Sequence, residues 1–169
     1  MLWLIIAFIF PIPIFHLWLH GLLPFWRKFP FIYYVVVGAI WICSFLFFRE
    51  IIPASPQLFE PNRVTIHLGD SMVFLGFLAA LGSLITIGPK RFFMYAVLRP
   101  EKVKQKRITK WVFKNCPHPA YNGYIFATFG ALIYTGNAVV ALVFIFLLTT
   151  TPIVMWLESN ELDERVKGR

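Results

Sequence analysis

Residues 120–157 read AYNGYIFATFGALIYTGNAVVALVFIFLLTTTPIVMWL and consist of two apolar runs, 120–135 and 138–157. Gly136 and Asn137 separate the two runs, and this pair of residues is typical of a tight turn. The second run is long enough to cross the hydrocarbon core of a bilayer, which takes about 20 apolar residues in a helix. The stretch therefore predicts an antiparallel helical hairpin inside a membrane.

Three further apolar runs precede the hairpin, at 2–25, 31–48 and 71–88. Pro11 and Pro13 predict a bend in the first of them, because proline removes a helical hydrogen bond. This first run has neither a basic n-region nor a small-residue cleavage site, so we expect a retained helix rather than a signal peptide. The five runs together predict an all-α integral membrane protein with about five transmembrane helices.

The composition agrees with this fold class. Hydrophobic residues make up 59% of the chain and charged residues 14%, against about 25% charged residues in an average soluble domain. Nothing in the sequence separates two cores, so we expect a single membrane domain, 1–169. Within it, 1–88 holds the three N-terminal spans, and 89–169 holds a basic loop, the hairpin and the tail. The two cysteines form no CxxC pair, and no metal site is predicted.

The positive charges are concentrated in the loop 89–119. This loop carries nine cations and one anion, Glu101, and the formal net charge of the chain is +8. Cations collect in cytoplasmic loops, so the loop and the C-terminal tail are predicted to be cytoplasmic and the N-terminus external. We interpret the charge as a topology and lipid-attraction signal, with no nucleic-acid partner. The nine cations are Lys90, Arg91, Arg99, Lys102, Lys104, Lys106, Arg107, Lys110 and Lys114.

Polar residues of chemical interest lie where the hairpin enters and leaves the membrane. His118, Pro119 and Tyr121 follow the basic loop, and Glu158 follows the last apolar run. Because a hairpin returns to the side on which it starts, these groups are predicted to share one rim under the basic loop. Polar groups at a membrane boundary are candidates for function. The alternative interpretation makes Tyr121 an interfacial anchor and His118 a solvated loop residue.

The segment HPAYNGYIFATFGALIYTGN, residues 118–137, resembles the membrane methyltransferases that include isoprenylcysteine carboxyl methyltransferase and phosphatidylethanolamine N-methyltransferase. Their pattern is Arg-His-Pro-x-Tyr-x-Gly, then a spaced glycine and asparagine, then Glu-Glu-x-x-Leu at the end of a helix. Glu158 and Leu162 match the last element, whereas Pro117 replaces the arginine and Ser159 the second glutamate. The matching residues of the first part are His118, Pro119, Tyr121, Gly123, Gly130 and Asn137.

The resemblance implies S-adenosylmethionine as the cofactor, bound in the 89–169 region and open to the cytoplasm. The two glycines would allow the close approach of a helix or of the cofactor. Glu158 is the implied catalytic residue, near the sulfonium or the acceptor. The implied function is methyl transfer to the carboxylate or amine of a membrane lipid or a lipidated small molecule. The implied cofactor-binding residues are His118, Pro119, Tyr121, Gly123, Gly130 and Asn137.

Three alternatives stay open. A non-enzymatic relative would keep the hairpin as a structural or partner-binding module. His16 and His20 share a helix face and would suit a haem-binding or metal-binding membrane protein. No second histidine pair exists on another span, so polar packing is the favoured interpretation of these two residues. A membrane reductase of the sterol type has a related terminal pattern but would use a nicotinamide cofactor.

Overall fold

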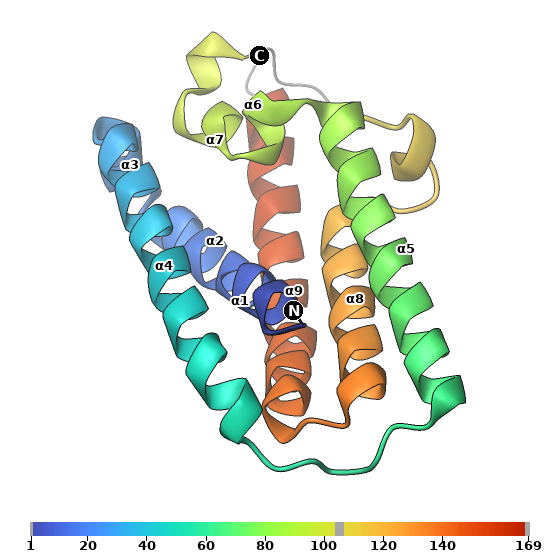
Figure 1. Ribbon diagram of the computed structural model, residues 1–169. Coiled ribbons are helices and arrows are strands. Elements are labelled where there is room, and N and C mark those ends of the chain that lie inside the picture. The colour runs from blue at the N-terminus through green and yellow to red at the C-terminus, as the bar shows by residue number, and fades with distance from the viewer. Residues whose placement is uncertain (1, 104–106, 168–169) are drawn as a thin grey trace.

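The computed structural model describes residues 2–103 and 107–167, and its main elements are long helices (Figure 1). The N-terminal part contains α1 (Leu2–Ile9), α2 (Pro11–Gly21), α3 (Leu23–Lys28) and α4 (Pro30–Ala54). The rest of the bundle is α5 (Arg63–Ile87) and a hairpin of α8 (Pro119–Thr135) and α9 (Ala138–Lys167). Short helices between α5 and α8 are α6 (Pro89–Phe92), α7 (Tyr95–Leu98), η1 (Pro100–Lys102) and η2 (Trp111–Phe113). The loop cations Lys104 and Lys106 lie outside the described residues.

Four segments are long and apolar enough to cross a membrane, by length and composition. They are Trp3–Gly21, Pro30–Ala54, Arg63–Ile87 and Ala138–Glu164. The fifth apolar helix, α8, has 17 residues and is about 25 Å long at 1.5 Å per residue. The described ranges contain no β-strand, only an isolated bridge between Gln57 and Asn137. The prediction of an all-helical membrane protein with a C-terminal hairpin is confirmed.

Two helices extend beyond the apolar runs that predicted them. α5 begins earlier, at Arg63, because Asn62 and Thr65 form a capping box in which each side chain accepts the other residue's N–H. α9 continues past Leu157 into the charged tail as far as Lys167. This last part of α9 contains neither glycine nor proline, so no residue in it breaks the helix.

The first span is interrupted at Phe10, where Pro11 and Pro13 predicted a bend. Pro11 has no N–H, so the carbonyl of Ala7, four residues earlier, loses its helical donor. The Ser44 hydroxyl of α4 donates to this carbonyl over 2.9 Å. The side chain of a neighbouring helix therefore satisfies the backbone group, as an apolar environment requires.

α5 and α8 form the most extensive helix pair among the described residues, and four glycines allow their close approach. Gly69 faces Gly130, and Gly76 faces Gly123. A Cβ atom added at Gly69 or at Gly123 would lie 2.5 Å from the carbonyl oxygen of the facing glycine. Small residues are what permits such contact between helices in membranes. This interface fixes the position of the first turn of α8, which carries candidate site residues.

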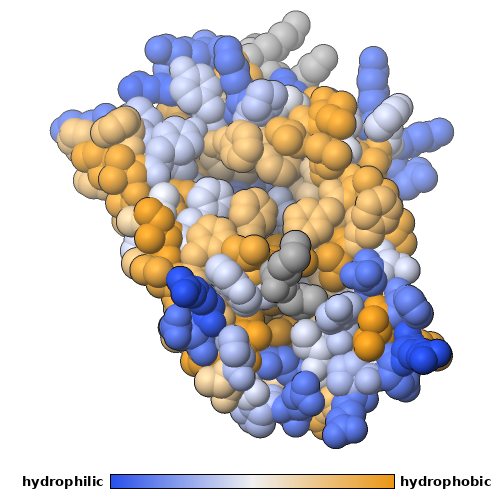
Figure 2. All heavy atoms as spheres, in the orientation of Figure 1, coloured by the Kyte–Doolittle hydropathy of each residue, from blue (hydrophilic) through white to orange (hydrophobic). Residues whose placement is uncertain are grey.

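The connections sort into two ends of the bundle (Figure 1). α3, the α6–α7 segment and the C-terminal part of α9 lie at one end, which we call the basic end. The 55–62 loop and the α8–α9 turn lie at the other. The segments predicted to be cytoplasmic therefore share one end. Figure 2 shows a broad apolar surface between hydrophilic ends, as expected of a multi-pass membrane protein.

Candidate functional site

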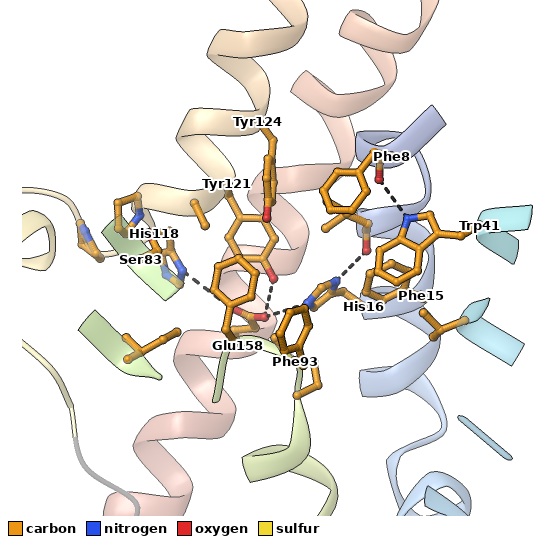
Figure 3. Close-up of a pocket in the computed structure, with 18 of the residues that line it drawn as sticks. Phe8, Phe15, His16, Trp41, Ser83, Phe93, His118, Tyr121, Tyr124 and Glu158 are labelled. Carbon is orange, nitrogen blue, oxygen red and sulfur yellow. Dashed lines mark hydrogen bonds and ion pairs between the residues drawn. The ribbon is translucent and has the colours of Figure 1, made fainter. Parts of the chain in front are cut away.

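Glu158 of α9 lies at the centre of a group of polar side chains (Figure 3). The Tyr121 hydroxyl donates to Glu158 Oε1 over 2.5 Å. His16 Nε2 lies 3.6 Å from the same oxygen, and His118 Nδ1 lies 3.8 Å from Glu158 Oε2. α2, α9 and the start of α8 thus bring one carboxylate, one phenol and two imidazoles together.

The start of α8 positions two of these residues. Pro119 occupies the first turn, where its fixed φ suits the helix and its missing N–H leaves no bond unmade. Tyr121 follows in the same turn and is buried. His118 precedes the helix, and its Nε2 lies 2.9 Å from Ser159 Oγ. Ser159, at the place of the second glutamate in the resembled pattern, therefore supplies a hydrogen-bond partner rather than a second charge.

The surroundings of His118 disfavour the charged form of its imidazole. Burial and the nearby Arg107 guanidinium lower the pKa of His118 below its ordinary value of 6.5. Arg107 also forms an ion pair with Asp163 of α9. This ion pair ties the basic loop to the tail.

An apolar cavity of about 150 Å³ opens on one side of Glu158. Its walls come from α1, α2, α4, α5, α8 and the α6–α7 segment. Two buried atoms that line it, His16 Nε2 and the Tyr33 hydroxyl, have no hydrogen-bond partner within the described ranges. Buried polar groups are rarely left unpaired, so these two atoms have bonding capacity for a ligand or a water molecule in the cavity. Aromatic residues dominate its lining, among them Phe8, Phe15, Tyr33, Trp41, Phe93 and Tyr124.

A second cavity, of about 300 Å³, lies under the basic loop. Its lining includes two cationic residues, Arg91 and Arg107, and the aromatic residue Phe113, among several apolar residues. Glu158 and His118 are among the six residues that line both cavities, so the two spaces adjoin at this group of residues. The carboxylate therefore stands where a cationic cavity meets an apolar one.

A second polar cluster lies closer to the basic end. His20 Nδ1 is 2.6 Å from Glu161 Oε2, and Arg27 Nη2 donates to Glu161 Oε1 over 3.2 Å. Arg27 Nε also donates to the Val97 carbonyl over 3.1 Å. These contacts tie α2, α3 and α7 to α9, and they hold in place the helix that carries His16.

Sequence reasoning missed the meeting of the N-terminal histidines with the carboxylates of α9. The structure gives His16 and His20 different carboxylate neighbours, consistent with polar packing rather than a shared ligand. No group of three or more His, Cys, Asp or Glu residues in 2–103 and 107–167 is arranged to hold a metal ion. A signal was present: the histidines are one helical turn apart, as are Glu158 and Glu161.

Gly123 and Gly130 face α5 and not a cavity. Of the two partners that the sequence left open for these glycines, a helix or the cofactor, the structure shows the helix. In the structure the two glycines place α8 against α5, and neither lines either of the two cavities.

Asn137 does not join the other predicted cofactor-binding residues. It lies in the α8–α9 turn, at the end of the bundle opposite to Glu158 (Figure 1). Its Oδ1 accepts the N–H groups of Val139 and Val140 at the start of α9 and the Ser55 hydroxyl. Its Nδ2 donates to the Ile52 carbonyl over 3.0 Å. The hydrogen bonds of this side chain join α4 to the hairpin.

Comparison with known proteins places this site in a family. The model of the family described as phospholipid methyltransferase matches residues 64–165. That range covers α5, the basic loop and the hairpin, and it includes His118, Tyr121 and Glu158. Comparison with curated proteins finds no match, and comparison with solved structures finds none. Because the family match covers more than half of the chain, this protein belongs to the phospholipid methyltransferase family.

Proposed function

We propose that the chain transfers a methyl group from S-adenosylmethionine to a lipid acceptor held within the membrane. One observation carries the proposal: Glu158 lies at the junction of a cationic cavity and an apolar one. Membership of a methyltransferase family supports it. A charged, water-soluble methyl donor and a lipid come from different media, and a junction of this kind lets them meet.

The chemistry of the cationic cavity suits S-adenosylmethionine. Arg91 and Arg107 offer guanidinium groups to its carboxylate. Phe113 offers an aromatic face on which an adenine ring can stack. Glu158 offers negative charge to a sulfonium. The residues present therefore fit the anionic, aromatic and cationic parts of this cofactor.

The cofactor supplies an electrophilic methyl group on a positively charged sulfur. The residues of the chain supply alignment and a water-poor site. Tyr121 fixes Glu158 Oε1 by its hydrogen bond, and His118 flanks the other carboxylate oxygen. We therefore assign Glu158 as the catalytic residue and His118, Pro119 and Tyr121 as residues of the cofactor side.

The apolar cavity is the proposed place of the acceptor. Its aromatic lining suits the hydrocarbon part of a membrane lipid or a lipidated small molecule. Residues of α4 and α5, two helices long and apolar enough to cross a membrane, line this cavity. A lipid could therefore approach it sideways from the bilayer.

The basic end is proposed to face the cytoplasm, because cations collect on that side of a membrane. Single cysteines test this in a background with Cys43→Ser and Cys116→Ser. Lys114→Cys, exposed in the basic loop, should react with a membrane-impermeant maleimide only from the cytoplasmic side. Glu60→Cys, exposed in the loop at the other end, is the matched probe and should react only from outside. The reverse labelling pattern overturns this orientation.

Calorimetry on the purified protein in detergent tests the proposed function. S-adenosylmethionine and S-adenosylhomocysteine are expected to bind and to raise the thermal midpoint. Methyl transfer is then measured from methyl-labelled S-adenosylmethionine to vesicles of phosphatidylethanolamine, an amine acceptor, or to a prenylcysteine, a carboxylate acceptor. Absence of binding by both cofactor forms at millimolar concentration overturns the proposal.

A second candidate is a relative that binds the cofactor without turnover. Pro117 and Ser159 favour it, since they replace an arginine and a glutamate of the resembled pattern. Cofactor binding with no methylation of either acceptor would support this candidate over the first.

A further inference from the structure

The N-terminal helices lie outside the family match, which begins at residue 64, yet α2 brings His16 into the site. His16 Nδ1 lies 2.6 Å from the Ile12 carbonyl oxygen, so this ring nitrogen carries the N–H. The other nitrogen of the neutral ring, Nε2, then presents a lone pair. Nε2 is buried beside Glu158, at ion-pair distance from its carboxylate (Figure 3), and no residue in the described ranges forms a hydrogen bond with it.

Glu158 faces this lone pair with a second hydrogen-bond acceptor. Its Oε1 lies 3.6 Å from His16 Nε2 and already accepts the Tyr121 hydroxyl. Two acceptors side by side in an apolar cavity are unfavourable unless a proton or a donor group lies between them. The arrangement therefore suits a ligand that brings N–H hydrogens to this point.

We propose that His16 is the proton acceptor of the reaction, an inference that rests on the proposed methyl transfer. The acceptor's ammonium group gives one proton to His16 Nε2, which frees the lone pair on nitrogen. That lone pair forms the bond to the methyl carbon, while the electron pair of the broken carbon–sulfur bond goes to sulfur. Glu158 balances the positive charge that His16 gains.

The proton has a way out of the apolar cavity. His118 Nδ1 lies 3.8 Å from Glu158 Oε2, and His118 also lines the cationic cavity. The distances from Glu158 to His16 and to His118 both exceed hydrogen-bond length. The two imidazoles must therefore move closer to the carboxylate when a ligand binds, as catalytic groups often do. A carboxylate acceptor has no proton to give at neutral pH. The role of His16 therefore requires an acceptor with N–H hydrogens.

The titratable groups around His16 come from four helices. Glu158 faces it from α9, Tyr121 from α8 and Tyr33 from α4, while His20 lies on its own helix. Glu158 is the anion among them, so it is the group that stabilises an imidazolium at His16. Removal of Glu158 is therefore expected to weaken proton transfer to His16.

Two substitutions separate the roles of the two ring nitrogens. His16→Asn keeps a short N–H donor for the Ile12 carbonyl but removes the group that reaches Glu158. His16→Gln keeps a polar group near Nε2 that cannot take up a proton. His67→Gln, at an exposed position of α5 away from both cavities, is the matched control.

Activity is measured with phosphatidylethanolamine vesicles, and binding with S-adenosylhomocysteine. We expect kcat near pH 7 to fall about 100-fold or more in both His16 variants, the range typical of a lost general base. Cofactor affinity and the activity of His67→Gln should stay at wild-type values. In His16→Gln the loss should shrink toward about pH 9.5, since more of the amine then arrives unprotonated. Spectra of ¹⁵N-labelled histidine should show an Nδ1–H tautomer that both variants lose.

Several outcomes overturn the role of His16 while the proposed function survives. They are a kcat within about threefold of wild type, an equal loss at every pH, an Nε2–H tautomer, or methylation of the prenylcysteine alone. Failure of the wild-type protein to bind S-adenosylhomocysteine is different. It overturns the proposed function itself, and this inference with it, before any variant is made.

Discussion

The two ends of the α8–α9 hairpin differ in how completely their buried polar groups are hydrogen-bonded within the protein. At the turn, Asn137 uses both atoms of its side-chain amide in hydrogen bonds to α4, Ser55 and the start of α9. At the basic end, His16 Nε2 and the Tyr33 hydroxyl have no hydrogen-bond partner in the described part of the chain. We call the turn the closed end, because its buried polar side chain is fully hydrogen-bonded within the protein. We call the basic end of the hairpin the open end, because bonding capacity is left there for a ligand. Open bonding capacity, rather than polarity, is what distinguishes the candidate site.

This difference divides residues that a sequence pattern joins. His118, Tyr121 and Asn137 belong to one spaced pattern, but a helix about 25 Å long separates the first two from the third. Hairpin geometry brings His118 and Tyr121 to Glu158 instead. One sequence pattern thus contains both candidate site residues, His118 and Tyr121, and a structural residue, Asn137, that caps α9 at the other end of the hairpin.

The largest expected effect lies at the open end. Glu158→Gln keeps the size of the side chain and an oxygen for the Tyr121 hydroxyl, but it removes the negative charge. Methyl transfer is expected to fall about 100-fold or more, as when a charge-stabilising group is lost. The thermal midpoint without ligand should stay near that of the wild type. Transfer of labelled methyl groups and calorimetric binding measure the two properties.

Glu60→Gln is the matched control, since Glu60 is an exposed carboxylate in the loop at the other end. It should leave both transfer and midpoint unchanged. A clearly lowered midpoint in Glu158→Gln, together with wild-type cofactor binding, would make Glu158 a structural residue. The contrast between the two ends would then disappear.

The next effect concerns the helix interface that runs between the two ends. Gly76→Ala places a methyl group against the Gly123 carbonyl oxygen and is expected to lower stability by about 1–3 kcal/mol, the usual cost of overpacking. Gly38→Ala on α4 is the control, because an added Cβ there meets nothing within 4 Å. Thermal midpoints in detergent compare the two variants. An unchanged midpoint in Gly76→Ala would show that α5 and α8 can separate without loss.

A smaller effect is expected at the closed end. Asn137→Ala removes the cap of α9 and the bond to the Ile52 carbonyl, at a cost of about 1–2 kcal/mol. Asn137→Asp keeps the accepting oxygen, but it replaces the donor to the Ile52 carbonyl by an acceptor and adds a negative charge, so its midpoint should also lie below that of the wild type. Affinity for S-adenosylhomocysteine should not change in either variant. Weakened binding of S-adenosylhomocysteine without loss of stability would show that Asn137 contributes to cofactor binding after all.

The sequence predicted the membrane helices because each apolar run is a property of one segment. It also predicted that His118, Tyr121 and Glu158 meet, since a hairpin fixes which of its positions lie side by side. The arrival of His16 depends on how α2 packs against α9. The matching one-turn spacings of the two histidines and the two glutamates are compatible with that contact but do not determine it. The helix pair α5–α8 had a visible signal, because Gly69 and Gly76 repeat at the same spacing as the two glycines of α8.

The smallest expected effect is a pH dependence at the rim of the open end. Burial and the Arg107 guanidinium lower the pKa of His118, and they outweigh the Glu158 carboxylate, which would raise it. In the unfolded chain His118 takes up a proton near pH 6.5, its ordinary value, whereas in the folded protein it does so only at lower pH. The unfolded state therefore binds more protons below about pH 6.5, and stability falls as the pH drops until the folded imidazole is protonated too.

His118→Gln should remove this part of the pH dependence of the thermal midpoint while leaving the part due to other groups. Added salt should also flatten the wild-type slope, because it screens the exposed Arg107 charge. If the thermal midpoint falls equally steeply with acid in wild type and in His118→Gln, the pKa of His118 is the same in the folded protein as in the unfolded chain, and this prediction is wrong.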